Sequence, residues 1–229
     1  ATNYQKLDVE EVAEQQTHLK VEERNVLAKI LRERIRLFQG TRGKYTGKPI
    51  HLELIKDAKP FHGRPFNVPK SQYKVVKDEV LRMVQEGIMS PTKNTSEWIA
   101  PTFGIPKKNN MVRIVTDFRG LNSQLKRKPY PLPLIQEIIQ TIGTYNYSTC
   151  LDLSMGYWSM ALDDPSKDLC TTALPWGMYR YNCLPMGIKP ASDIFQAEMN
   201  TLFLDMENVV VYIDDIVIFS SETFEEHME

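Results

Sequence analysis

Two adjacent aspartates, Asp214 and Asp215, lie between two apolar segments, residues 209–213 and 216–219. Both segments are rich in β-branched and aromatic residues, which predicts two buried strands joined by a tight turn at the aspartates. A single aspartate would indicate only a turn, because Asp is a common turn residue. Two neighbouring carboxylates in a partly buried turn raise each other's proton affinity unless a cation neutralises them. The pair therefore favours a divalent cation such as Mg²⁺, which prefers one or two protein carboxylates together with substrate phosphates.

A third carboxylate, Asp152, lies near the end of a predicted strand, residues 147–153. Leu151 and Leu153 should point to one side of that strand and Asp152 to the other. Asp152 could instead cap the strand end or form a salt bridge. If the strand lies beside the 209–219 hairpin, three carboxylates meet at one edge of a sheet. Such a cluster suits two metal ions that assist phosphoryl transfer.

The elements that must position these carboxylates form an α+β pattern. Apolar residues at three-to-four spacing predict four helices, at residues 21–38, 73–86, 134–142 and 190–206. Alternating patterns predict two further hairpins, residues 98–118 with a turn at 107–110, and residues 171–184 with a turn at 175–177. The remaining segments are a loosely ordered polar lead-in over residues 1–18, Gly- and Pro-rich loops over 41–70 with one short strand near 50–54, and a proline cluster over 129–133 that we expect to be a subdomain hinge.

Composition and charge narrow the classes of protein. The chain has 229 residues, 42% hydrophobic and 25% charged, as in one large or two small globular domains. No apolar run reaches the ~18 residues of a membrane span, and three cysteines without metal-ligand spacing favour a reducing compartment. Residues 41–130 carry 18 Lys and Arg against 7 Asp and Glu, whereas residues 151–229 carry 3 against 14. Either one half faces phosphates, or the two halves attract each other.

Four segments together resemble the motifs of reverse transcriptases. Residues 212–215 (Tyr-Ile-Asp-Asp) resemble the aromatic-x-Asp-Asp signature of that family. The other three are 151–157 (Leu-Asp-Leu-Ser-Met-Gly-Tyr), similar to the first metal-binding motif; 184–187 (Leu-Pro-Met-Gly) followed by Phe195-Gln196, similar to the nucleotide-site motif and helix; and 113–122, similar to a fingers motif. They occur in the family's order. Three earlier segments, residues 16–19 (Gln-Thr-His-Leu), 22–24 (Glu-Glu-Arg) and 59–64 (Lys-Pro-Phe-His-Gly-Arg), further resemble the gypsy class of long-terminal-repeat retroelements. The sequence also begins at Ala1 rather than Met, which we take as a sign of a piece of a longer protein.

The resemblance implies a right-hand polymerase with fingers and palm subdomains, an antiparallel palm sheet packed on helices, and no thumb. We expect a lead-in with one helix over residues 1–48, and fingers and palm over 49–229, the palm being truncated shortly after the Asp-Asp hairpin. The implied activity is an RNA-directed DNA polymerase that adds dNTPs to a primer 3′-hydroxyl by two-metal nucleotidyl transfer. One alternative is a truncated, non-catalytic nucleic-acid-binding module with a polymerase fold. A template-independent phosphotransferase is disfavoured, because the sequence has no G-x-x-x-x-G-K loop.

The resemblance also assigns roles to individual residues. The metal ligands and catalytic residues are Asp152, Asp214 and Asp215, helped by the backbone carbonyl of Leu153, with Mg²⁺ as cofactor and Mn²⁺ as a possible substitute. The nucleotide-binding residues are Arg113 and either Lys107 or Lys108 at the triphosphate, Tyr157 as the steric gate against a ribose 2′-hydroxyl, and Met186. The template-binding residues are Arg119, Pro185 and Gly187. Without the motif, the pattern of residues around Tyr157 favours a core aromatic over a steric gate.

The implied partners are a primed RNA or DNA template, a dNTP, and the rest of a polyprotein with thumb, connection and ribonuclease H domains. The resemblance places such an enzyme in a cytoplasmic retroelement particle, away from any membrane. Two departures concern substrate binding. Met186 stands where relatives usually have Gln or an aromatic residue, and residues 189–192 read Lys-Pro-Ala-Ser where an Asn-Ala-Pro type of sequence is more usual.

Overall fold

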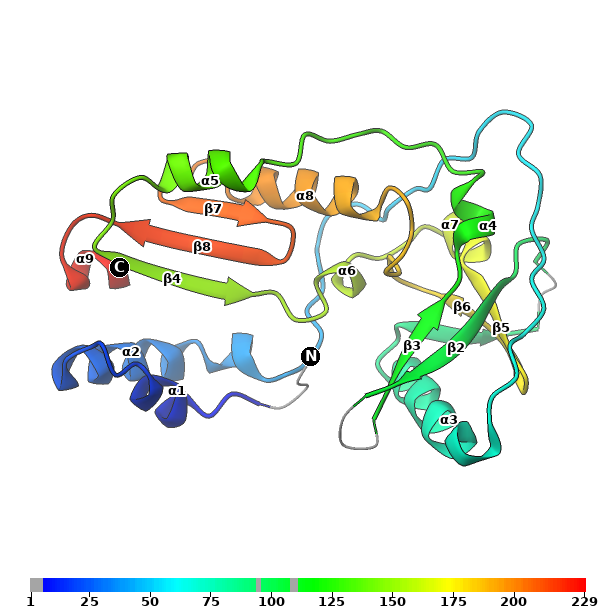
Figure 1. Ribbon diagram of the computed structural model, residues 1–229, viewed down its shortest axis with the longest axis horizontal. Coiled ribbons are helices and arrows are strands. Elements are labelled where there is room, and N and C mark those ends of the chain that lie inside the picture. Colours follow the sequence, from blue (N-terminus) through cyan, green and yellow to red (C-terminus); the bar gives the residue numbers. More distant parts are fainter. Residues whose placement is uncertain (1–5, 94–95, 108–110) are drawn as a thin grey trace. The chain divides into compact units, whose positions relative to one another are not determined.

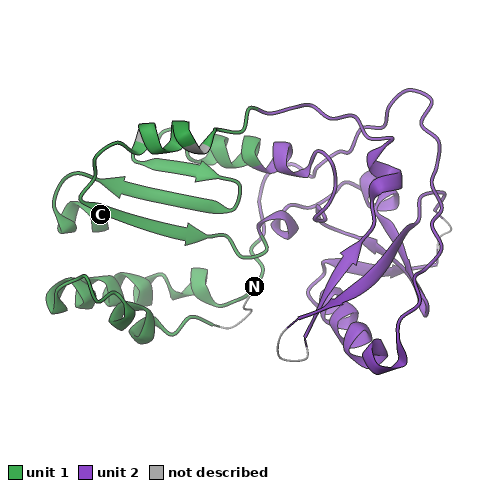
Figure 2. Cartoon of the chain, in the orientation of Figure 1, with its two compact units in different colours: residues 1–43, 131–155, 196–229 green, residues 44–130, 156–195 purple. Residues whose placement is uncertain are grey.

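The computed structural model describes residues 6–93, 96–107 and 111–229 (Figure 1). The chain divides into two compact units (Figure 2). Unit 1 comprises residues 1–43, 131–155 and 196–229, and unit 2 comprises residues 44–130 and 156–195. One of the boundaries falls at residues 130–131, within the predicted proline hinge. Another falls within helix α8 (Ala191–Leu202), which begins in unit 2 and ends in unit 1.

Unit 1 contains the sheet that carries the aspartates. Strands β4 (Tyr147–Asp152), β8 (Asp215–Ser220) and β7 (Val209–Tyr212) form an antiparallel sheet in the order β4-β8-β7. The predicted strands are therefore confirmed, and the strand that carries Asp152 lies beside the hairpin that carries Asp214 and Asp215. Helix α5 (Ile135–Ile142) also belongs to this unit, and it agrees with the predicted helix to within one residue.

The N-terminal residues of unit 1 differ from their prediction. Helix α1 (Val9–Gln15) occupies part of the expected loose lead-in, so that prediction was wrong for the described residues. Asp8 caps α1 by accepting the backbone N–H groups of Glu10 and Glu11 at 3.1 and 3.2 Å. The few apolar residues of α1 pack on helix α2 (Val21–Glu33), where Ala28 is buried. The predicted helix to residue 38 ends at Glu33, and a 3₁₀ turn (Ile35–Phe38) follows.

Unit 2 contains a five-stranded sheet packed against helix α3 (Lys70–Gln85). The strand order is β1 (Met89–Thr92), β6 (Gly177–Tyr181), β5 (Thr171–Leu174), β2 (Ala100–Pro106) and β3 (Val112–Thr116). β2 and β5 are parallel and the other pairs are antiparallel. A Cβ on Gly104 would lie 2.8 Å from the side chain of Val76, so glycine lets α3 approach β2 closely. Both predicted hairpins are confirmed, although residues 108–110 of the first turn lie outside the described residues.

Some elements of unit 2 were mispredicted or missed. The short strand expected near residues 50–54 is wrong, because Ile50 and Leu54 form only isolated bridges to Leu162 and Leu125. The sequence patterns also missed β1 and the short helices α4 (Arg119–Asn122), α6 (Gly156–Ser159), α7 (Asp164–Leu169) and, in unit 1, α9 (Phe224–Met228). α8 ends at Leu202 rather than at residue 206. None of the helices in the described ranges is long and apolar enough to cross a membrane.

Candidate active site

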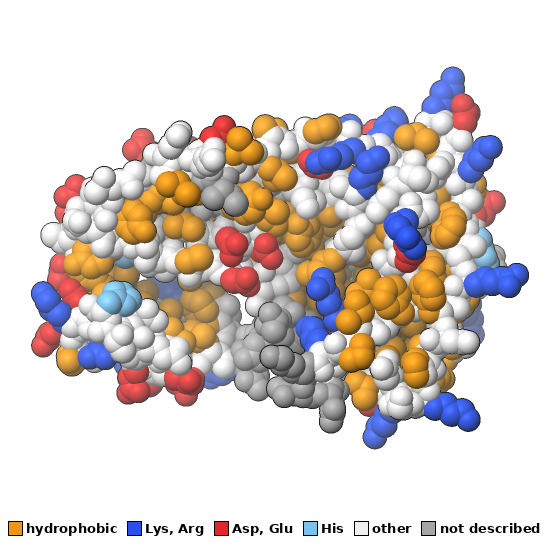
Figure 3. Space-filling model, in the orientation of Figure 1, with side chains coloured by type: hydrophobic (Ala, Val, Ile, Leu, Met, Phe, Trp, Pro, Cys, Tyr) orange, Lys and Arg blue, Asp and Glu red, His pale blue; other side chains and the backbone are white. Residues whose placement is uncertain are grey.

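The three aspartates lie at the same end of the β4-β8-β7 sheet. Asp152 at the end of β4 is the register partner of Asp215 at the start of β8. Tyr212 also pairs with Asp215, so Ile213 and Asp214 form a two-residue turn between β7 and β8. The N–H of Leu153 donates to the backbone carbonyl of Asp214 at 2.8 Å, which ties the end of β4 to this turn. In the space-filling view, acidic side chains gather at this end of the hairpin (Figure 3).

The charges of these aspartates are not neutralised within the described residues. Asp152 and Asp215 are exposed and Asp214 is half-buried, and no Lys, Arg or His in the described ranges forms an ion pair with any of them. Residues 131–155 and 196–229 contain 11 Asp and Glu but no Lys or Arg. A salt bridge for Asp152 therefore finds no support in the described part of the chain.

The donor chemistry of this cluster suits a hard divalent cation. The available ligands are carboxylate and carbonyl oxygens, which Mg²⁺ prefers over nitrogen or sulfur. However, no group of three His, Cys, Asp or Glu in the described ranges is arranged closely enough to hold a metal ion. The aspartates share one sheet edge, and oxygens from a substrate would be needed to complete a coordination sphere.

The turn that carries Asp214 has an unusual backbone, which a buried side chain supports. Ile213 has a φ of 56°, a region in which a β-branched residue is strained. Gln196 on α8 is fully buried, and its Oε1 accepts the N–H of Ile213 at 2.7 Å. Its Nε2 donates to the carbonyl of Val211 at 2.9 Å and to Oδ1 of Asn200 at 2.7 Å. The sequence patterns assigned no role to Gln196 beyond its place in a motif, although a glutamine beside the apolar stripe of α8 was a usable signal.

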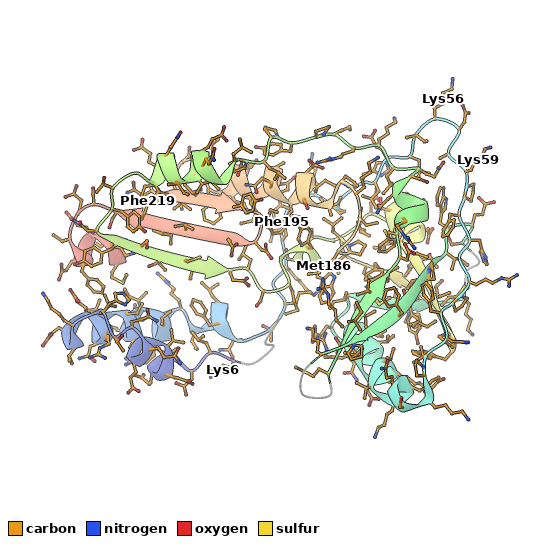
Figure 4. All side chains as sticks on the ribbon, viewed as in Figure 1. Lys6, Lys56, Lys59, Met186, Phe195 and Phe219 are labelled. Atoms are coloured by element: carbon orange, nitrogen blue, oxygen red, sulfur yellow. The ribbon has the colours of Figure 1, made fainter. Side chains whose placement is uncertain are left out.

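Unit 2 brings together two of the residues predicted to bind nucleotide. Arg113 is exposed on β3, and its Nη2 lies 3.6 Å from Sδ of Met186. Met186 is 40% exposed on the loop before α8 (Figure 4). Lys107 is half-buried at the neck of the β2-β3 hairpin, where its N–H donates to the carbonyl of Met111 at 2.8 Å. Lys108 lies outside the described residues.

Tyr157, the predicted steric gate, lies on the short helix α6 and is half-buried. Its ring stacks on the buried ring of Phe195, with centroids 4.8 Å apart and an interplanar angle of 28°. Its hydroxyl lies 3.1 Å from Oγ of Ser192. One side of the ring thus packs as a core aromatic would, while part of the side chain remains accessible.

Two of the predicted template residues, Arg119 and Gly187, line a concavity of about 580 Å³ within unit 2. Arg119 pairs with Asp117 at 2.6 Å, and this contact holds the pKa of the Asp117 carboxyl below its ordinary value. Pro185 is buried and is not among the lining residues. The remaining lining residues are Phe66, Asn67, Phe103, Val115, Thr116, Asp117, Phe118 and Asn122.

Asn122 joins two parts of this concavity. Its Nδ2 donates to the carbonyl of Gly187 at 2.8 Å, and its Oδ1 accepts the N–H of Lys189 at 2.8 Å. The loop that carries Met186 and Gly187 is therefore fixed to α4. In the nearby basic run, Lys126 and Lys128 both pair with Glu53, so these two charges are partly neutralised within the unit.

Comparison with known proteins identifies the family. Residues 105–229, more than half of the chain, match the family model described as "Reverse transcriptase (RNA-dependent DNA polymerase)". The chain belongs to this family, whose members are generally metal-dependent. The resemblance on which the sequence predictions rested is thereby confirmed.

Two of the similar curated proteins are retrotransposon polyproteins. The "Retrovirus-related Pol polyprotein from transposon 412" of Drosophila melanogaster is 30% identical over 182 residues, which cover 76% of this chain and 14% of that protein. The corresponding polyprotein from transposon gypsy is 30% identical over 172 residues, which cover 72% of this chain and 16% of that protein. The chain thus spans about a sixth of the length of these relatives.

Solved structures confirm the fold class. A prototype foamy virus protease–reverse transcriptase superposes with a TM-score of 0.85 at 22% identity, covering 96% of this chain and 30% of that one. The foamy viral enzyme in complex with an RNA/DNA hybrid gives a TM-score of 0.84, also at 22% identity and with the same coverage. The predicted α+β polymerase fold with an antiparallel sheet is therefore confirmed.

Proposed function

We propose that this chain carries the polymerase active site of a retrotransposon reverse transcriptase, an RNA-directed DNA polymerase that transfers dNTPs to a primer 3′-hydroxyl. The observation that carries the proposal is the register of the unit 1 sheet. It pairs Asp152 with Asp215 and leaves Asp214 in the adjoining turn. Family membership supports the same activity. The primer hydroxyl would attack the α-phosphate of the dNTP in line, forming the new phosphodiester bond as the bond to the β-phosphate breaks and pyrophosphate leaves. The protein would contribute mainly positioning and charge stabilisation.

We propose Mg²⁺ as the cofactor, with Mn²⁺ as a possible substitute. Asp152, Asp214 and Asp215 would hold it, together with the backbone carbonyl of Leu153. When bound, a pair of such ions would activate the attacking oxygen and stabilise the leaving group. The exposed positions of Asp152 and Asp215 leave room for substrate oxygens beside them.

Unit 2 would bind the substrates. It carries 20 Lys and Arg against 11 Asp and Glu, a net charge of +9 that suits phosphates. Arg113 would bind the triphosphate through its planar fork of donors, with Lys107 or Lys108 as the second cation and Met186 beside it. Tyr157 would face the sugar of the incoming nucleotide. The template would lie along the concavity that Arg119 and Gly187 line, with Pro185 supporting the loop from below.

We further propose that the chain acts within a polyprotein. The curated relatives are polyproteins several times longer than this chain, and two foamy virus structures carry double-stranded DNA or an RNA/DNA hybrid. By the same analogy, the partner is a primed RNA or DNA template. The polyprotein would also contain thumb, connection and ribonuclease H domains, and the reaction would take place in a cytoplasmic particle.

The decisive experiment is primer extension on an RNA template with Mg²⁺, comparing the chain with its Asp214→Asn and Asp215→Asn variants. Asp205→Asn is the matched control, because Asp205 is exposed and lies outside the sheet. Loss of extension by at least about 1,000-fold in both site variants but not in the control would support the proposal, since metal-bound groups contribute several kcal/mol to such transition states. Extension that persists in either site variant would refute it.

The net charge of unit 2 favours a second candidate, a non-catalytic nucleic-acid-binding module. Binding of labelled primer-template should be measured in the same samples at several salt concentrations. A folded chain that binds primer-template with a steep salt dependence, but extends no primer, would support this second candidate. Binding that is absent or insensitive to salt would contradict both candidates.

A further inference from the structure

The first turn of α8 contains a buried carboxylate that joins it to a distant part of the chain. The side chain of Asp193 is only 2% exposed, whereas that of its partner Arg127 is 46% exposed. Oδ2 of Asp193 accepts Nε of Arg127 at 2.7 Å, and Oδ1 accepts Nη2 of the same guanidinium at 3.0 Å. Oδ1 also accepts the backbone N–H of Tyr130 at 3.0 Å. Three hydrogen bonds thus fix residues 127–130 to the start of α8, all of them within unit 2.

The residues on either side of Asp193 hold the ring of Tyr157. Ser192 precedes it and lies 3.1 Å from the Tyr157 hydroxyl. Phe195 is two positions further along α8, and its ring stacks under that of Tyr157. The first turn of α8 therefore contacts the ring by its hydroxyl and by one face. Any displacement of this turn would move both contacts together.

We infer that Asp193, held by Arg127 and the Tyr130 amide, and Ser192 are positioning residues that set the sugar specificity of the nucleotide site through Tyr157. This inference rests on the proposed function, in which Tyr157 faces the sugar of the incoming nucleotide. A ring excludes a 2′-hydroxyl only if it cannot move aside, because the clash to be maintained involves one oxygen atom. Buried, charge-assisted hydrogen bonds to a helix are suited to holding such a position.

The geometry separates the effects of the two residues. Removing the Ser192 hydroxyl deletes one neutral hydrogen bond to the ring and leaves the helix in place. Losing one such bond changes an equilibrium by about 2- to 10-fold. Replacing the Asp193 carboxylate with an amide removes its charge and one of the two oxygens that accept from Arg127, so the tie between the first turn and residues 127–130 weakens and both contacts to Tyr157 loosen. The larger loss of selectivity is therefore expected for Asp193, and both changes should affect ribonucleotides more than deoxynucleotides.

The test measures the ratio of dCTP to CTP incorporation in primer extension, with both substrates offered to the same enzyme preparation. The ratio does not depend on the folded fraction, so a merely structural role would not change it. Ser192→Ala should lower the ratio by about 2- to 10-fold, and Ser192→Thr, which keeps a hydroxyl, should restore it. Asp193→Asn should lower the ratio by at least as much as Ser192→Ala. The matched control is Asp168→Asn, which removes the surface ion pair with Arg180 elsewhere in unit 2.

A second measurement does not require catalysis. The chain is labelled with 3-fluorotyrosine, and the ¹⁹F resonance of Tyr157 is assigned by its loss in Tyr157→Phe. The inference expects Ser192→Ala and Asp193→Asn to shift or sharpen this resonance, and Asp168→Asn to leave it unchanged. An unchanged resonance in both site variants would overturn the inference, as would an unchanged dCTP-to-CTP ratio. If the unmodified chain extends no primer, the proposed activity of this chain fails, and the fluorine spectra alone decide whether α8 positions the ring.

Discussion

The buried amide of Gln196 offers a sharp test of how this fold supports its carboxylates. Gln196→Leu keeps the side-chain volume nearly constant but removes the acceptor for the N–H of Ile213 and the donor to the carbonyl of Val211. An unsatisfied buried N–H costs about 1–3 kcal/mol. The left-handed φ of 56° at Ile213 stores about 1–2 kcal/mol of strain. The two magnitudes are comparable, so the turn has two possible responses.

If the turn keeps its conformation, the free energy of unfolding falls by about 1–3 kcal/mol. If the turn relaxes, the released strain offsets part of that loss, but the backbone of Asp214 moves relative to Asp152 and Asp215. In that case the affinity for Mn²⁺ should fall at least severalfold. One of the two quantities must therefore change. We expect the second response, because Gln196 is the described partner of the Ile213 N–H, whereas the β7-β8 register and the Leu153 N–H hold only the residues beside it.

The assay must report on unit 1. All three tryptophans, at positions 98, 158 and 176, lie in unit 2, so their fluorescence would miss a local change in the hairpin. Hydrogen exchange of a peptide covering residues 209–220 reports the hairpin directly, and the electron paramagnetic resonance of free Mn²⁺ reports metal binding. Thr201→Ala is the control, because the Thr201 hydroxyl donates to the Ala197 carbonyl on the exposed side of the same helix, away from the turn. If Gln196→Leu matches this control in both measurements, the proposed support of the turn is refuted.

Three further predictions address other parts of the molecule. Tyr181→Phe should lower the free energy of unfolding of unit 2 by about 1–2 kcal/mol, because the buried Tyr181 hydroxyl bonds to Thr116 at 2.9 Å. Burial also raises the pKa of this hydroxyl to about 12. Tryptophan-monitored denaturation measures the change, and an unchanged midpoint would show that the hydroxyl contributes nothing. Burial lowers the pKa of His227, so the unfolded chain binds a proton more readily than the folded chain does. The free energy of unfolding should therefore decrease as pH falls below about 6.5 towards the folded pKa. His227→Gln should remove this pH dependence from the hydrogen exchange of α9. Arg119→Ala should reduce the salt dependence of primer-template binding, measured as the slope of log affinity against log salt concentration, by about 0.7–0.9. The reason is that the Arg119 side chain is 89% exposed in the proposed template concavity. An unchanged slope would place the template elsewhere.

Local sequence patterns were sufficient wherever periodicity and turn chemistry agree. The alternating apolar segments around Asp214 and Asp215 predicted two strands and their turn, and the three-to-four spacing of Val76, Val80 and Met83 predicted the buried side of α3. α1 was missed because seven residues with two buried side chains give too little periodicity, and its cap at Asp8 was the stronger signal. β1 was missed because Met-Ser-Pro-Thr has no strand pattern, and its pairing with β6 supplies what its sequence does not.

The site was harder to predict than the secondary structure, because it depends on contacts between residues that are distant in the sequence. The aspartate types could be read from the sequence, but the pairing of Asp152 with Asp215 joins positions more than 60 residues apart. Periodicity within either strand carries no information about such a pairing. The roles of Gln196 and Asp193 were still harder to predict from the sequence. Each is a polar residue on a helix, and only the structure reveals that its side chain points inward to backbone or guanidinium groups.

Several features of this chain would be unfavourable if stability alone were selected. Like charges meet at Asp152, Asp214 and Asp215 in segments that contain no Lys or Arg, and a β-branched residue occupies a left-handed turn. The fold tolerates these features because other groups hold the local backbone, namely the Gln196 amide at the hairpin and the Leu153 amide at the end of β4. Strain and uncompensated charge concentrated at one sheet edge are characteristic of functional sites rather than of structural turns. The costs fall on the segments that carry the proposed metal ligands. The supporting hydrogen bonds come from Gln196, which would meet neither metal nor phosphate, and from the N–H of Leu153, a group separate from its proposed ligand carbonyl. This separation is the physical reason to expect that Gln196 can be altered without removing a ligand, and that Asp214 can be altered without unfolding the sheet.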